Sequence, residues 1–192
     1  MSADVRSVAD LIALTASGQR IKYLLFWGHT PARDGRASAS CLSQWSAEGF
    51  TVDGNRFATA EHYMMWRKAM LFGDAVSAER ILAAGHPRDA KLLGGRVTPF
   101  DQQVWDAERF AIVVAGNLAK FQQNRGLGTF LTGTGGRVLV EASPTDRIWG
   151  IGLTREDPRA ENPARWRGLN LLGFALMEVR ARLADSAQVS IR

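Results

Sequence analysis

The stretch TAEHYMMWRKAMLFGD, residues 59–74, decides most of the fold of this chain. Thr59 belongs to the residue types that cap helix N-termini, and Gly73 is the type that ends helices. The spacing between them predicts a helix over residues 60–72 that is apolar nearly all round. Helices of that kind are usually buried, so we expect this one to lie in the core, where each charged side chain needs a reason to be present.

Two charged residues of this helix, Glu61 and Lys68, are candidates for chemistry. They are seven residues apart, which is two helical turns, so they share one face with Met65 between them. Glu61 could instead complement the helix dipole, and Lys68 could extend its ammonium group to solvent. The sequence leaves the structural and the functional interpretation open for both residues.

Turn and cap residues divide the rest of the chain into short elements. Asp53-Gly54 is a strong hairpin signal, and Asp74, Pro87 and Asp101 are each suited to begin a helix. Apolar periodicity completes the pattern. It predicts helices at 5–16, 75–84, 87–93, 102–124, 127–132 and 169–184, and strands at 21–28, 50–57 (a hairpin) and 137–142.

With 192 residues, of which 46% are hydrophobic and 22% charged, the chain fits one globular domain. We predict a single helix-rich α+β domain with a few short strands over residues 1–192, with 1–20 as an N-terminal helical extension and 184–192 as a loose tail. No apolar run reaches the roughly 18 residues of a membrane span, and the first residues lack the layout of a secretory signal. The single cysteine, Cys41, fits a reducing environment, so we expect a cytoplasmic protein without membrane partners.

The positive charge comes almost entirely from arginine, with 20 arginines and 4 lysines against 19 acidic residues, a net charge of +5. Arginine binds phosphate oxygens bidentately, so this surface suits phosphorylated ligands, although the arginines could equally be scattered over a solvated face. Lys120, near the end of the predicted helix 102–124, either complements the helix dipole or contacts a phosphate. We select it as a candidate phosphate ligand.

The segment VLVEASPTDRIWGIGL, residues 138–153, is the second candidate for chemistry. A predicted strand ends at Glu141 and leads into a loop that holds Asp146, Trp149 and Gly150. Carboxylates, an aromatic plate and glycines at the end of a strand are typical of ligand sites, because glycine permits close approach and tryptophan stacks on a base or ribose. A structural turn with Trp149 in the core is the alternative.

A third segment surrounds the predicted strand 21–28, where Trp27 and Gly28 precede a small-residue loop and Trp45 follows it. These residues could wall a pocket for a planar ligand or simply pack in the core. Cys41 has no recognisable histidine–acid pair beside it, so we exclude a thiol nucleophile. The three histidines are widely spaced, so we expect neither a metal nor a cofactor.

Several blocks occur together in one order: FWGHTP, CLSQW, TAEHYMMWRKAMLFGD, AGNLAKFQQN, VLVEASPTDRIWGIGL and NLLGFALMEVR. In that order the chain, from about residue 26 to residue 183, resembles the YbiA-like, or NADAR, family of N-glycosidases. The resemblance implies an α-rich α+β fold and the hydrolysis of N-glycosidic bonds to ribose. Ile151 departs from the pattern, since many members have aspartate after Trp-Gly.

Position by position, the resemblance places the family's functional residues on Glu61, Lys68, Trp105, Asp146, Trp149, Gly150, Asn170 and Gly173. With the candidates from the segments above, the predicted site has three catalytic residues and a larger set that contacts substrate. The catalytic residues are Glu61, Lys68 and Asp146; the substrate-binding residues are Trp27, Gly28, Trp45, Trp105, Lys120, Glu141, Trp149, Gly150, Asn170 and Gly173.

Cleavage of a ribosyl C–N bond needs a proton on the departing nitrogen and a stabilised charge at C1. Glu61, desolvated on an apolar helix, is the expected proton donor, and Lys68 could attack C1 and form a Schiff base. Three functions stay open: hydrolysis of phosphoribosylaminopyrimidine intermediates of riboflavin synthesis as metabolite damage control, removal of ADP-ribose from guanine bases of nucleic acid, and binding of ADP-ribose or a nucleotide without turnover. The partner is therefore a phosphorylated ribosyl compound, free or attached to nucleic acid.

Overall fold

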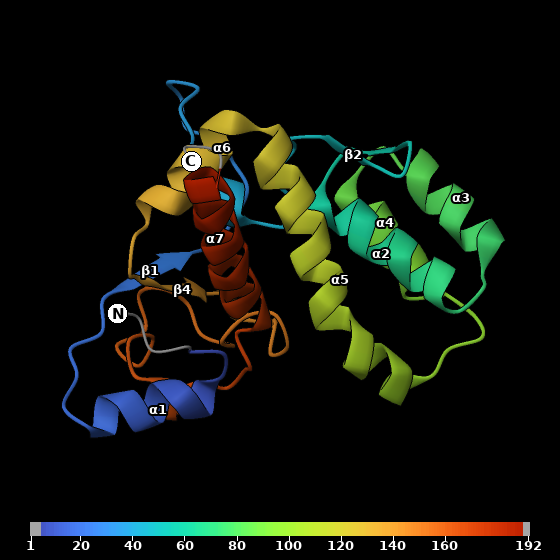
Figure 1. The fold of residues 1–192 in the computed structure, drawn as a ribbon. Helices are drawn as coiled ribbons and strands as arrows, with labels where there is room; N and C mark the ends of the chain where they lie inside the picture. Colours follow the sequence, from blue (N-terminus) through green and yellow to red (C-terminus); the bar gives the residue numbers. More distant parts are fainter. Residues whose placement is uncertain (1–4, 190–192) are drawn as a thin grey trace.

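The computed structural model describes residues 5–189, and helices make up most of its regular secondary structure (Figure 1). The helix-rich α+β class predicted from the sequence is confirmed. The helices are α1 (Val8–Ala16), α2 (Ala60–Leu71), α3 (Ala75–Ala83), α4 (Pro87–Gly94), α5 (Gln102–Gln123), α6 (Arg125–Gly133) and α7 (Leu171–Val189); the strands are β1 (Tyr23–Phe26), β2 (Phe50–Val52), β3 (Asn55–Phe57) and β4 (Val138–Glu141), with short 3-10 turns at Ala39–Leu42 and Pro163–Arg165.

Local cap and turn chemistry sets the boundaries of these elements. The Thr59 hydroxyl accepts the backbone N–H of His62 and begins α2, and the Asp74 carboxylate caps α3 in the same way. Asp53 and Gly54 both have positive φ, 50° and 79°, so β2 and β3 are joined by the kind of turn that Asp-Gly favours. The predicted start of α2, the start of α3 and the hairpin are therefore confirmed.

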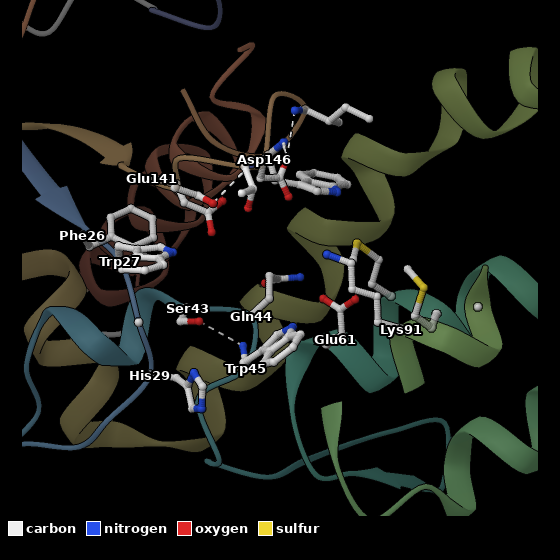
Figure 2. Close-up of a pocket in the computed structure, with 18 of the residues that line it drawn as sticks. Phe26, Trp27, His29, Ser43, Gln44, Trp45, Glu61, Lys91, Glu141 and Asp146 are labelled. Carbon is white, nitrogen blue, oxygen red and sulfur yellow. Dashed lines mark hydrogen bonds between the residues drawn. The ribbon is translucent and has the colours of Figure 1, made fainter. Parts of the chain in front are cut away.

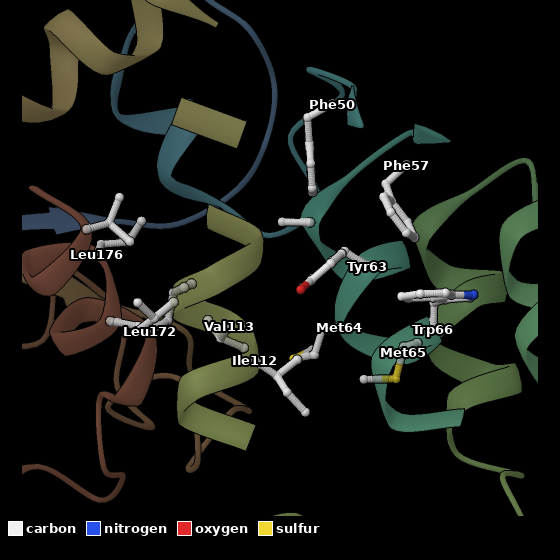
Figure 3. Close-up of a cluster of buried hydrophobic side chains, with 14 of the residues drawn as sticks. Phe50, Phe57, Tyr63, Met64, Met65, Trp66, Ile112, Val113, Leu172 and Leu176 are labelled. Atoms are coloured by element: carbon white, nitrogen blue, oxygen red, sulfur yellow. The ribbon is translucent and has the colours of Figure 1, made fainter. Parts of the chain in front are cut away.

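Helix α2 is buried on all sides at its N-terminal half, where every residue from Ala60 to Trp66 is buried. Tyr63 and Trp66 pack against the rings of Phe50 and Phe57 from the hairpin, with centroids of Tyr63 and Phe57 5.1 Å apart (Figure 3). Helices α3, α4 and α5 contact the other faces of α2. The apolar sequence of residues 60–66 is thus explained by packing in every direction.

Two strands far apart in the sequence form a parallel pair that the sequence did not predict. β1 pairs with β4 so that Phe26 lies opposite Glu141. Helix α7 packs along β4, and α5 lies between this part of the molecule and α2 (Figures 1 and 3). Because parallel strands end at the same edge, the residues that follow β1 and those that end β4 meet there.

The N-terminal segment packs on a second, smaller apolar cluster behind β4, which includes Val5, Leu11, Val140 and Phe174. At the other end, α7 continues to Val189, so the loose tail expected from residue 184 is helical as far as the description extends. Helix-forming residues continue past Leu183 without a glycine or proline to stop the helix. In the part of the chain that is described, no helix is long and apolar enough to cross a membrane.

The close packing of α2 on α5 gives a direct test of the fold. A Cβ on Gly116 of α5 would lie 2.3 Å from Tyr63 Cδ1, so we expect Gly116→Ala to lower the free energy of unfolding by about 1–3 kcal/mol. Gly126→Ala in α6 meets no atom within 4 Å and should instead stabilise by roughly 0.5–1 kcal/mol. Chemical denaturation of both variants measures this, and equal stabilities would contradict the packing described.

Candidate active site

A pocket of about 690 Å³ opens between the carboxyl ends of β1 and β4 on one side and α2 with α4 on the other (Figure 2). It brings together nine of the residues predicted from the sequence, which come from segments more than a hundred residues apart. These nine are Trp27, Gly28, Trp45, Glu61, Lys68, Trp105, Glu141, Asp146 and Trp149.

Glu61 lies in the first turn of α2 and is only 4% exposed. Its backbone N–H donates to the Gln44 carbonyl at 2.9 Å, which fixes the start of the helix against the loop that carries Trp45. Burial raises the pKa of Glu61 to about 7, the nearby charge of Asp146 adds to this, and Lys91 and a hydrogen bond with the Trp45 side chain oppose it. The carboxyl group is therefore protonated in a substantial fraction of molecules near neutral pH.

Glu141 is the last residue of β4 and faces the same pocket from the opposite wall (Figure 2). Its Oε2 atom is buried and has no hydrogen-bond partner among the described residues, and the same holds for Oε1 of Glu61. Burial raises the pKa of Glu141 to about 8, and the charges of Asp146 and Glu61 raise it further, while Lys91 lowers it. The pocket thus holds two desolvated carboxyl groups.

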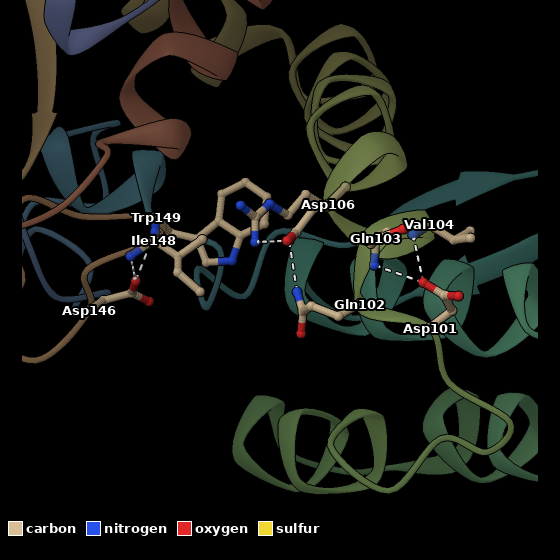
Figure 4. A network of polar contacts seen from close by, with 9 residues as sticks. Asp101, Gln102, Gln103, Val104, Asp106, Asp146, Ile148 and Trp149 are labelled. Carbon is tan, nitrogen blue, oxygen red and sulfur yellow. Dashed lines mark hydrogen bonds and ion pairs between the residues drawn. The ribbon is translucent and has the colours of Figure 1, made fainter.

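Asp146 also lines the pocket, but one of its oxygens is committed to the backbone. Oδ1 accepts the N–H groups of Ile148 at 2.9 Å and Trp149 at 2.7 Å, which closes the turn after β4 (Figure 4). This is the turn that the sequence offered as the structural alternative for Asp146. The carboxylate therefore positions Trp149 and at the same time adds negative charge to the pocket.

Lys68 reaches the pocket from the C-terminal half of α2. Its ammonium donates to the Gly94 carbonyl at 2.9 Å and lies 4.2 Å from the Phe100 ring centroid and 5.6 Å from that of Trp105. Burial lowers the pKa of Lys68, which increases the share of neutral amine. Both a nucleophilic and a purely electrostatic role remain compatible with this geometry.

Aromatic rings form the remaining walls. Trp27 is 59% exposed at the rim, where it follows β1, and Gly28 beside it has a φ of 81°, a conformation that favours glycine. Trp45 lies between His29 and His86, with ring centroids 5.7 and 5.9 Å away. These planar surfaces suit a ligand with a flat base.

Lys120 does not belong to this site, so its selection as a phosphate ligand was wrong. It is 0% exposed, and its ammonium donates to the carbonyls of Cys41 at 2.7 Å and Ser43 at 3.0 Å. Burial lowers its pKa to about 8. Lys120 is a structural residue that ties α5 to the loop before Trp45, because its side chain points into the core and not along the helix end.

Three further residues predicted to touch substrate lie behind the wall of the pocket. Asn170, 0% exposed with a φ of 53°, accepts the Glu141 N–H at 3.0 Å through Oδ1 and donates to the Leu139 carbonyl at 3.0 Å. A Cβ on Gly173 would lie 2.1 Å from the Leu139 oxygen, and one on Gly150 would lie 2.8 Å from the Glu141 oxygen. Asn170 and Gly173 therefore pack β4 against α7, and Gly150 packs the following loop against the end of β4; none of the three is among the residues that line the pocket.

The prediction from the sequence did not include several residues that line the pocket, and Lys91 is the most important of them. It comes from α4, a short amphipathic helix in which a lysine looks like an ordinary surface residue. Its rarity, as one of only 4 lysines, was the available signal. Gln44 and Ser143 also line the pocket, and both are uncharged polar residues in loops without a distinguishing pattern.

The described residues do not support a thiol nucleophile. Cys41 is buried away from the pocket, and burial raises the pKa of its thiol to about 11, which removes the reactive thiolate. Within residues 5–189 no group of three or more histidine, cysteine or acidic side chains is arranged to hold a metal ion. The titratable groups that line the pocket are thus Glu61, Glu141, Asp146, the two lysines and His29.

Comparison with known proteins shows which proteins the chain is similar to. A family model described as the NADAR domain matches residues 25–184. N-glycosidase R617 of Acanthamoeba polyphaga mimivirus is 42% identical over 164 residues, covering 83% of this chain and 95% of that protein, and N-glycosidase YbiA of Escherichia coli (strain K12) is 30% identical over 143 residues, covering 74% and 81%. The NMR structure of E. coli YbiA superposes with a TM-score of 0.70 at 26% identity and covers 88% of this chain and 89% of that one.

The buried carboxyl groups predict how stability depends on pH. Glu61 and Glu141 have folded-state pKa values of about 7 and about 8, above their ordinary value of 4.5, so the folded state binds more protons over that interval. The free energy of unfolding should therefore fall as pH rises from 5 to 8.5, by roughly 1–3 kcal/mol per group. Urea denaturation at both pH values should show a shallower fall for Glu61→Gln and Glu141→Gln than for the wild type. The exposed control Glu108→Gln should keep the wild-type slope, and equal slopes in all four proteins would contradict the buried titrations.

Proposed function

Because the chain belongs to the NADAR family, we propose that it is an N-glycosidase that hydrolyses the bond between ribose and a base or amine. The observation that carries the proposal is Glu61, a desolvated acid on the wall of a pocket that is large enough for a nucleoside phosphate. The relatives named N-glycosidase support the same reaction class. A non-catalytic binding module is less well supported, because a passive pocket has no need of buried acids.

We propose phosphoribosylaminopyrimidine intermediates of riboflavin synthesis as the substrates, in a damage-control role. The tryptophan walls suit the pyrimidine, and the lining carboxyls suit the ribose hydroxyls and the amine. Among the described lining residues the cations are lysines, Lys68 and Lys91, and none is arginine. The phosphate is therefore assigned to a lysine and not, as the composition suggested, to an arginine. A cytoplasmic location, favoured by the single cysteine, completes the proposal.

Removal of ADP-ribose from guanine is the second candidate function. The pocket is open at the rim beside the exposed Trp27, so a ligand with a second nucleotide moiety could extend beyond it. Incubation of the purified protein with a phosphoribosylaminopyrimidine and, separately, with ADP-ribosyl-guanosine distinguishes the two. Release of free pyrimidine alone supports the first function, release of guanine alone supports the second, and binding of either compound without release would overturn the enzymatic assignment.

The chemistry requires a proton-transfer group, and Glu61 is positioned for it. Replacement of Glu61 by glutamine preserves the shape of the side chain but removes the titrating proton, so turnover should fall by about 10²–10⁴-fold. Substrate KM should change little by comparison, since the packing around α2 is retained. Steady-state kinetics measures both values, with the exposed Glu108→Gln as the control. A Glu61→Gln variant with near wild-type turnover would exclude the proposed role.

The role of Lys68 distinguishes two mechanisms, direct hydrolysis by water and a covalent route through the lysine amine. If its amine attacks C1, the base leaves, and the opened sugar forms an imine that water hydrolyses to restore the lysine. We lean towards this route because burial favours the neutral amine. Borohydride added during turnover should then trap a ribosyl adduct on the wild type, identified by mass spectrometry, and Lys68→Arg should be inactive. An active Lys68→Arg variant together with no trapped adduct would leave direct hydrolysis by the carboxyl groups.

A further inference from the structure

We propose that Glu141 is the residue that protonates the departing nitrogen, that Glu61 is the base that activates water, and that Asp146 is a positioning residue and not a catalytic one. This inference rests on the proposed N-glycosidase function and deepens it. It reverses the role that the sequence suggested for Glu61 and replaces Asp146 as the second carboxyl group. Four features of the pocket support it.

The first feature is the rigid placement of Glu141. Its backbone is held on both sides, since its N–H donates to Asn170 Oδ1 at 3.0 Å and its carbonyl accepts the Ile151 N–H at 2.9 Å. The parallel pairing with Phe26 fixes the same residue from the direction of β1. A side chain on such a backbone has few ways to leave the pocket, which is what proton transfer to a bound substrate requires.

The second feature is the unused hydrogen-bonding capacity of Glu141. Its buried Oε2 has no partner among the described residues, although buried polar atoms are normally paired. The side chain points towards the centre of the pocket, across from Glu61 (Figure 2). An unpaired carboxyl oxygen in this position is available to a group on the ligand.

The third feature is the occupation of Asp146. Its Oδ1 already accepts two backbone N–H groups, from Ile148 and Trp149, and these bonds shape the loop (Figure 4). Protonation or movement of this carboxylate would weaken the turn that carries Trp149. Asp146 is therefore suited to hold the loop and to act on its neighbours through its charge.

The fourth feature is the charge around each carboxyl group, which assigns the two roles. Burial and the charge of Asp146 raise the pKa of Glu61, but Lys91 of α4 lies beside it (Figure 2), and the Lys91 ammonium and a hydrogen bond with the Trp45 side chain favour its ionised form. Glu141 lies on the opposite wall on the same side as Asp146, and the charges of Asp146 and Glu61 favour its protonated form (Figure 2). Lys68 of α2 lines the same pocket but has its own partner, the Gly94 carbonyl. When the pair has lost one of its two protons, the remaining proton therefore resides on Glu141.

These roles define the cleavage step. The C1–N bond breaks, its electron pair goes to the nitrogen, and that nitrogen takes the proton of the Glu141 carboxyl group. A water molecule gives a proton to the Glu61 carboxylate as its oxygen bonds to C1; in the covalent route C1 is then the imine carbon, and its bond to the Lys68 nitrogen breaks to restore the amine. The products are the free amine or base and the ribose with a hydroxyl at C1, and transfer of one proton from Glu61 to Glu141, directly or through water, restores the starting state.

Two leaving groups test the assignment. An aminopyrimidine nitrogen needs a proton to depart, whereas the base of a ribosyl pyridinium phosphate leaves as a neutral molecule without one. We expect Glu141→Gln to lose about 10²–10⁴-fold in kcat on the aminopyrimidine and less than about tenfold on the pyridinium substrate. Glu61→Gln should lose activity on both, since water must still be activated. A Glu141→Gln variant that loses equally on both substrates, or on neither, would overturn the role as acid.

A second measurement does not depend on activity. Carbon-13 NMR of glutamate-labelled protein, with the Glu141 signal identified by its absence in Glu141→Gln, should show this carboxyl titrating well above its ordinary pKa. Asp146→Asn keeps the turn-forming oxygen but removes the charge, so it should move that titration, and the alkaline limb of the kcat/KM profile, to lower pH. A Glu141 signal that titrates near its ordinary value, or does not respond to Asp146→Asn, would overturn the inference. If neither substrate is cleaved by the wild type, the proposed function itself fails, and the catalytic role fails with it.

Discussion

The complete burial of the first half of α2 is the constraint on which the site depends. Packing of α2 on the hairpin rings, on α4 and on α5 leaves Glu61 only 4% exposed, so its carboxyl group can face only the pocket. Placing an acid there costs stability unless it is protonated or paired. Lys91 and the Trp45 side chain partly stabilise the ionised form of Glu61. Its pKa is nevertheless raised to about 7, and a carboxyl group that titrates near neutral pH is suited to proton transfer.

The other half of the pocket depends on a junction between β4, its following loop and α7. Asn170 connects all three, because its side chain bonds to residues 139 and 141, its N–H donates to the Gly150 carbonyl, and its own carbonyl accepts the Phe174 N–H of α7. Gly150 and Gly173 are glycines because backbone oxygens occupy the space that a side chain would need. These residues act on the chemistry indirectly, by fixing where Glu141 stands.

Much of this could be predicted from the sequence, where local rules apply. The cap at Thr59, the turn at Asp53-Gly54 and the apolar helix were correct because their signals are contained in short segments, and the family resemblance is confirmed by the match over residues 25–184. Whether a given side chain points into the pocket or away from it could not be predicted from short segments. Lys120 and Asn170 are polar residues in motifs that also supply the pocket, yet they point away from it, and Lys91 enters through a packing between helices that no spacing reveals.

The central claim is that burial keeps the carboxyl groups of the pocket protonated close to neutral pH, and a neutron structure tests it most directly. Crystals of the perdeuterated wild-type protein at pH 6, below both perturbed pKa values and well above the ordinary value of 4.5, locate each acidic deuteron without a substrate. The account predicts deuterium density on the carboxyl groups of Glu61 and Glu141. Bare carboxylates at both positions would contradict it.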